Sequence, residues 1–155
     1  MTQFQKVSLF ILRITLGWLY FYAGITKVLN SAWSAEGYIK GAKNFVGMYQ
    51  YFLDPGILPI VNFMNKWGLL LLGISLIFGI FVRLSAVCGI LLMLMYYFVI
   101  LQYPHPSPQS YIVDQHIIYI AVLLYFIAVA AGRAWGVDGW LRRKWGRVKA
   151  FTLFG

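Results

Sequence analysis

Acidic residues are scarce in this chain of 155 residues. The chain has four of them, and none lies between residues 55 and 113: they are Glu36, Asp54, Asp114 and Asp138. Cysteine is rarer still, because Cys88 is the single one. Thiol–disulfide chemistry that needs two cysteines within the chain is therefore excluded, and we interpret Cys88 as a small packing residue.

Histidine is also rare, with only His105 and His116 present. His105 lies in a short segment broken by three prolines, and His116 lies at the start of an apolar run. Neither belongs to a metal-ligand pattern such as HExxH or CxxC, and the pair does not lie at opposed mid-membrane positions. No metal or haem site is predicted within this chain.

Apolar residues dominate instead. Hydrophobic residues make up 61% of the chain and charged residues 11%, whereas soluble domains are about 25% charged. Four apolar runs, at about 7–29, 62–82, 84–103 and 112–131, each approach the ~20 residues that a membrane-spanning helix needs. The sequence predicts one all-α integral membrane domain over residues 1–155, with four transmembrane helices in one bundle.

The first loop, at about 30–61, carries a second helical pattern. Aromatic and small residues recur there at steps of three and four: Tyr38, Ala42, Phe45, Tyr49 and Phe52. This spacing predicts an amphipathic helix over about 36–53 that lies in the membrane interface and ends before Pro55. Such a helix either caps the outer end of the bundle or rests on the surface.

The basic residues predict the orientation. With the N-terminus inside, nine of them lie on the cytoplasmic side and four on the outer side: the latter are Lys27, Lys40, Lys43 and Lys66. The positive-inside rule then places both termini in the cytoplasm of a prokaryotic-type cell. The basic tail at 133–155 is expected to contact anionic lipid headgroups rather than nucleic acid.

Two cations lie in the first apolar run. Arg13 and Lys27 are separated by 14 helical positions, which is about 21 Å along the axis and about 40° around it. Both therefore lie on one face of the helix, close to Gly17 and Gly24, where a neighbouring backbone can approach. The two cations are either end anchors or groups that face the bundle interior.

The outer cation has candidate partners at the start of the fourth run. Asp114 either stabilises the first turn of that helix through its dipole or joins His116 and Lys27 at the mouth of the bundle. His116 changes charge near neutral pH, so that it can exchange protons with a quinone head group or a small anion. We take Lys27, His116 and Asp114 as candidate catalytic residues, and Gly24, Trp67 and Tyr119 as candidate cofactor-binding residues.

A second polar group is expected at the cytoplasmic end. Arg13, Arg83 and Arg133 gather there with a single acid, Asp138. This composition predicts either structural ion pairs, formed by Arg13 and Arg83 with Asp138, that close the bundle, or a pocket that tolerates an anion.

Three segments carry a resemblance to a known family. They are Leu12-Arg13 through Gly24-Ile25-Thr26-Lys27, Leu71-Leu72-Gly73 through Gly79 to Arg83, and Ala131-Gly132-Arg133 through Asp138. In order and spacing they resemble the DoxX-like membrane proteins, a group that includes the DoxD subunit of thiosulfate:quinone oxidoreductase. The resemblance implies four membrane helices and, as one possible activity, transfer of electrons from thiosulfate to a membrane quinone.

Three functions are consistent with these observations. The first is a quinone-linked oxidoreductase subunit, which predicts an apolar pocket with convergent polar groups. The second is a non-catalytic scaffold that recruits other membrane or peripheral subunits through exposed glycine grooves. The third is a pathway for small solutes or protons, which predicts a wetted route between the Arg13 and Lys27 ends.

Overall fold

The computed structural model describes residues 1–100, 104–106 and 109–145. The helices in this part of the chain are α1 (Gln3–Leu29), α2 (Glu36–Lys40), α3 (Val46–Tyr51), α4 (Leu58–Phe78), α5 (Val82–Ile100), α6 (Gln115–Val129), the 3₁₀ turn η1 (Ala131–Arg133) and α7 (Val137–Trp145). The described residues form no β-strand. Part of the predicted basic tail, residues 146–155, lies outside the described residues.

Within the described residues, three helices are long and apolar enough to cross a membrane: Gln3–Leu29, Leu58–Phe78 and Val82–Val99. They correspond to the first three predicted spans. The fourth predicted span, 112–131, contains only the 15 residues of α6. A helix of this length extends about 22 Å, which is shorter than the ~30 Å hydrocarbon core of a bilayer.

Local sequence explains where these helices begin and end. Thr2 caps α1 through a capping box with Gln5, and Asp114 caps α6 by accepting hydrogen bonds from the N–H groups of His116 and Ile117. Helix α4 ends at Gly79, whose φ of 68° is the left-handed conformation that glycine adopts without strain. A tight turn at residues 79–81 therefore separates α4 from α5.

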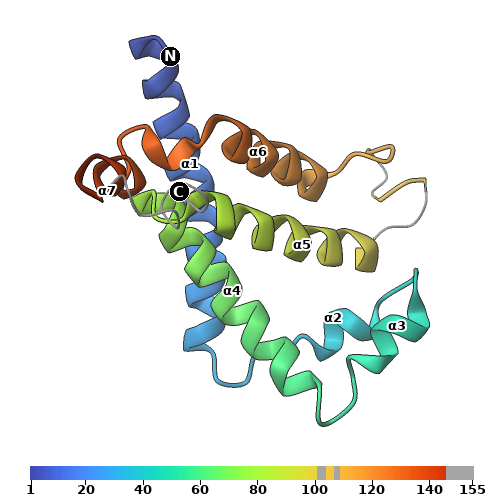
Figure 1. The fold of residues 1–155 in the computed structure, drawn as a ribbon. Coiled ribbons are helices and arrows are strands. Elements are labelled where there is room, and N and C mark those ends of the chain that lie inside the picture. The colour runs from blue at the N-terminus through green and yellow to red at the C-terminus, as the bar shows by residue number, and fades with distance from the viewer. Residues whose placement is uncertain (101–103, 107–108, 146–155) are drawn as a thin grey trace.

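The helices are arranged in two antiparallel pairs. In Figure 1, α4 runs back along α1, and α5 and α6 lie side by side and lead away from that pair. Gly24 packs against the backbone of Leu70, and Gly73 packs against the backbone of Phe21. A side chain at either glycine would collide with the facing helix, so small residues set the close approach of α1 and α4.

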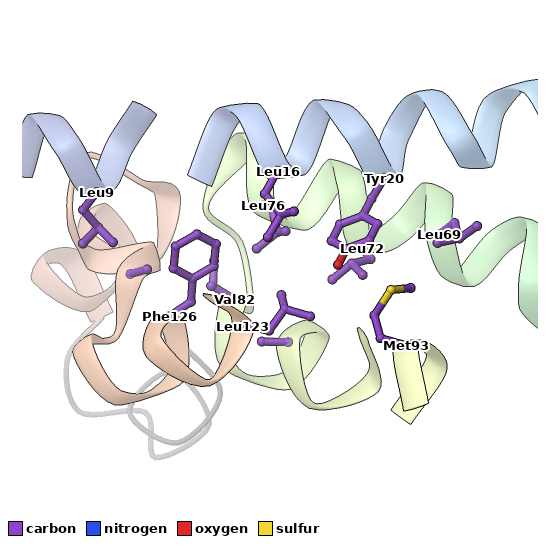
Figure 2. Close-up of a cluster of buried hydrophobic side chains, with 12 residues drawn as sticks. Leu9, Leu16, Tyr20, Leu69, Leu72, Leu76, Val82, Met93, Leu123 and Phe126 are labelled. Carbon is purple, nitrogen blue, oxygen red and sulfur yellow. The ribbon is translucent and has the colours of Figure 1, made fainter. Parts of the chain in front are cut away.

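The main core lies where the two pairs meet. Leu16 and Tyr20 of α1 face Leu72 and Leu76 of α4 in Figure 2, and Leu123 approaches the same cluster from α6. Leu76 and Leu123 are completely buried. This apolar packing occupies the middle of the molecule, between the polar groups at its two ends.

The predicted single helix over 36–53 is wrong. The segment forms two short helices, α2 and α3, because Gly41 ends the first and Phe45 takes a left-handed φ of 51° before the second. Both nevertheless bury one side: Ile39 and Tyr49 join a second apolar cluster with Val99 of α5. The segment thus packs on the ends of α4 and α5.

Candidate functional site

Four helices bring one polar residue each to the same end of the molecule. Lys27 lies in the last turn of α1, Asn65 on α4, Tyr96 on α5 and His116 in the first turn of α6. All four line one cavity, and we call this part of the molecule the Lys27 end.

Lys27 is held by a hydroxyl group and aromatic rings. Its Nζ donates a hydrogen bond to the Tyr96 hydroxyl at 3.3 Å, and that hydroxyl donates to Asn65 Oδ1 at 2.6 Å. Lys27 Nζ also lies 5.3 Å from the centre of the Trp33 ring and 5.5 Å from that of Tyr96. Within the described residues no carboxylate lies within 4.0 Å of Lys27 Nζ, so its charge is left for an anionic or electron-rich ligand.

His116 is bound to the acid that begins its own helix. The ring Nδ1 lies 2.6 Å from Asp114 Oδ2, while the other carboxylate oxygen, Oδ1, caps α6. Both side chains are about nine-tenths buried, with exposed fractions of 11% for His116 and 9% for Asp114. Because Nδ1 is engaged, Nε2 is the ring nitrogen that remains for a ligand.

The cavity has a volume of about 310 Å³. Trp33, Ser34, Ala35 and Tyr38 close it from the loop and α2. Burial raises the pKa of Tyr38 to about 12, with further contributions from Asp114 and Tyr49, so this phenol remains a hydrogen-bond donor at neutral pH. The eight lining residues are Lys27, Trp33, Ser34, Ala35, Tyr38, Asn65, Tyr96 and His116.

The sequence-predicted site residues divide into two groups. Lys27 and His116 both line the cavity, and Asp114 supports His116 from behind without lining it. The other three candidates do not line the cavity. Gly24 packs against the backbone of α4, and Trp67 is 41% exposed. Tyr119 lies beside the cavity, where its ring contacts those of His116 and Tyr20.

Sequence reasoning missed Tyr96, Asn65 and Trp33. Asn65 gave a usable signal, since it is an amide inside an apolar helix and is 8% exposed. Tyr96 gave little, because it is one of two adjacent tyrosines and only the fold selects which of them faces Lys27.

The opposite end of the molecule is built around Arg13, which is completely buried. Its Nη1 donates to the carbonyls of Ala131 at 2.6 Å and Ala134 at 3.0 Å, and its Nη2 donates to that of Trp135 at 3.4 Å. These carbonyls follow α6, where the helical hydrogen-bond pattern has ended. We call this part the Arg13 end.

Asp138, also at the Arg13 end, binds backbone amides at the beginning of α5. Its carboxylate accepts hydrogen bonds from the N–H groups of Phe81 at 2.8 Å and Val82 at 3.2 Å. Burial raises the pKa of Asp138, whereas these two bonds and the charges of Arg13 and Arg133 favour the ionised form.

Within the described residues, no direct ion pair joins Arg13 and Asp138. Each side chain binds backbone groups, because the turns around residues 79–81 and 131–135 offer free amides and carbonyls at closer range. Gly79 and Gly136 leave the space in which the guanidinium lies. Arg83, the third residue of the predicted group, lies in the first turn of α5.

The fold and its two ends define a class. This is a helical membrane protein with an apolar centre, a backbone-bound arginine at one end and a cavity with polar groups at the other. Comparison with protein families gives a match to DoxX over residues 8–102, more than half of the chain. The chain belongs to the DoxX family. Neither curated proteins nor solved structures give a match.

The family match covers α1, α4 and α5 but not α6. Lys27, Asn65 and Tyr96 therefore lie in the matched region, whereas Asp114 and His116 lie beyond it. The third segment of the sequence resemblance, residues 131–138, also lies beyond the match, yet it packs against the first two segments at the Arg13 end.

Proposed function

We propose that this DoxX protein is a membrane subunit of a quinone-linked oxidoreductase and that the cavity at the Lys27 end binds the head group of the quinone. The observation that carries the proposal is the convergence of an ammonium group, a phenol and a carboxylate-bound histidine on one cavity. Ligand cavities of this kind, mostly apolar with a few convergent polar groups, are the usual place of binding and chemistry.

The residues present fit a quinone head group. Such a group, when bound, accepts two electrons and two protons. Lys27 Nζ would donate to a quinone oxygen and stabilise negative charge on it, while the Tyr96 hydroxyl, whose proton goes to Asn65, positions the ammonium group. His116 would pass a proton to the head group from Nε2, and Asp114 fixes the orientation of the ring through Nδ1.

The charges around the cavity favour a small anionic electron donor. Lys66 Nζ lies 5.6 Å from the centre of the Trp33 ring, and Lys27 Nζ lies 5.3 Å from the same centre, so two ammonium groups gather around this ring. Thiosulfate is such an anion, and it is the donor that we propose. Further membrane or peripheral subunits complete the path of the electrons in this proposal.

Two alternatives receive less support. A scaffold that recruits partners through glycine grooves needs these grooves to be free. The grooves at Gly24 and Gly73 are occupied, because α1 and α4 pack against each other there. A solute or proton pathway needs polar groups between the two ends, but the space between them is occupied by the leucine-rich core.

The test begins with the protein purified from its native membranes. We expect the extracted lipids to contain quinone and the protein to reduce added quinone when thiosulfate is present. Lys27→Met removes the charge and keeps most of the side-chain volume, so it should lower quinone binding by about tenfold or more, as expected for losing a charged hydrogen bond.

Lys43→Met is the matched control, because Lys43 is exposed in the loop between α2 and α3 and does not line the cavity. It should bind quinone like the unmodified protein. Absence of bound quinone, together with equal behaviour of both variants, would overturn the proposal in favour of the scaffold.

A further inference from the structure

A second cavity, of about 250 Å³, lies beside the first. It is lined by residues of four helices: Ile39 of α2, Tyr49 of α3, Val61 and Met64 of α4, and Met95 and Val99 of α5. The two short helices α2 and α3 thus form one wall of it, and the long helices form the other.

The polar groups of this second cavity are already engaged with one another. The Tyr49 hydroxyl donates to the Met95 carbonyl at 2.8 Å, and the Tyr38 hydroxyl donates to the Tyr96 carbonyl at 3.3 Å. Asn65 Oδ1 accepts from Tyr96. A water molecule needs two to four polar partners, so a cavity that presents mainly hydrocarbon is suited to an apolar group instead.

The two cavities share a boundary. Ala35, Tyr38, Asn65 and Tyr96 line both of them, so the two cavities adjoin. The rings of Tyr38 and Tyr96, which belong to both linings, contact each other edge to face with their centres 5.6 Å apart. On its other side the second cavity reaches Met64, which is 64% exposed. The neighbouring surface of α4 is apolar and exposed at Ile60 and Phe63, as expected of a surface that faces lipid.

We infer that the second cavity binds the aliphatic chain of the same ligand whose head group lies at Lys27. The substrate is then a quinone with a hydrocarbon side chain that enters from the bilayer past Met64, and α2 and α3 are part of the binding site. This inference rests on the proposed function and adds the class of quinone and the role of the first loop.

The test compares two benzoquinones, one without a side chain and one with a decyl chain, on purified protein in one detergent. Val61→Phe adds volume inside the second cavity. Because the added ring takes up room that the chain would occupy, we expect Kd for the decyl quinone to rise about tenfold. Kd for the quinone without a chain should change less than about twofold, since that ligand does not enter the second cavity.

Val87→Phe makes the same change on the exposed side of α5, where Val87 is 48% exposed, and should affect neither ligand. Partition of the decyl chain into detergent is the same for all variants and cancels in the comparison. If Val61→Phe weakens both ligands equally or neither of them, the inference is wrong.

Lys27→Met separates this failure from failure of the proposed function. If Lys27→Met weakens binding of the quinone without a chain while Val61→Phe leaves the decyl quinone unaffected, the head-group site stands and the chain site is wrong. If neither quinone binds to the unmodified protein, both proposals are wrong.

Discussion

At the scale of single residues, two cations of one helix have different surroundings. The Arg13 guanidinium donates to three carbonyl oxygens that follow α6, so its hydrogen bonds connect the first and last parts of the structure. Lys27 contacts a phenol and two rings beside a cavity. The planar fork of arginine suits several fixed acceptors, whereas the ammonium group of lysine is a point charge suited to an incoming ligand.

Arg13→Lys tests the first of these roles. A lysine cannot reach three carbonyls at once, and each lost hydrogen bond from a charged donor costs about 1.5–3 kcal/mol. We expect a lower midpoint of thermal unfolding, measured in detergent. Arg143→Lys, at an exposed position in α7, should leave the midpoint unchanged. Equal midpoints for the two variants would contradict a structural role of the guanidinium.

Asp114 combines two roles that substitution can separate. Asparagine still caps a helix, so Asp114→Asn should keep the stability of α6, while Asp114→Ala should lose about 1 kcal/mol. Both changes remove the carboxylate from His116, so both should slow quinone reduction by about tenfold, less than loss of a whole proton-transfer group. The measurement is thiosulfate-dependent quinone reduction beside thermal unfolding. Slower turnover in the alanine variant alone would assign Asp114 to capping only.

At the scale of helices, the seam between α1 and α4 determines the geometry of both ends. The glycines allow the two backbones to touch, and this contact fixes where Lys27 lies relative to Asn65 and where Arg13 lies relative to Gly79. The segment containing α2 and α3 depends on the same frame, because it packs on α4 and α5 through Ile39 and Tyr49.

Gly73→Ala tests this seam. A methyl group there would collide with the backbone of Phe21, which cannot move without shifting α1, so we expect destabilisation by about 1–3 kcal/mol. Gly47→Ala is the control within another helix, since nothing lies within 4 Å of the position, and it should be neutral or slightly stabilising. Thermal unfolding of both variants gives the comparison; a stable Gly73→Ala protein would show that the helices can separate without cost.

At the scale of the whole molecule, the Arg13 end and the Lys27 end each bring α1 and α6 together. The hydrogen bonds of Arg13 place the chain after α6 beside the first half of α1, and the cavity places the start of α6 beside the last turn of α1. The charge distribution predicts that the Arg13 end faces the cytoplasm and the Lys27 end faces outward.

Labelling of cysteines tests this orientation. In a Cys88→Ala background, Lys43→Cys should react with a membrane-impermeant maleimide on intact cells. Arg143→Cys should react only after the membrane is permeabilised, because α7 is expected on the cytoplasmic side. The reverse pattern would show that the orientation is inverted. Labelling of both residues on intact cells would show that α6 does not cross the membrane.

The sequence by itself determined the class of the protein, its three long spans and the candidates Lys27 and His116. These follow from local composition: apolar runs, glycine, and rare charged groups in a lipid environment. Only the tertiary structure decided that Asp138 binds the amides of α5 and that Tyr96 lies beside Lys27. It also decided that residues of the first loop line a second cavity. The reason is that these contacts join residues far apart in the chain, and helix packing, not sequence spacing, fixes which side chains and backbone groups meet.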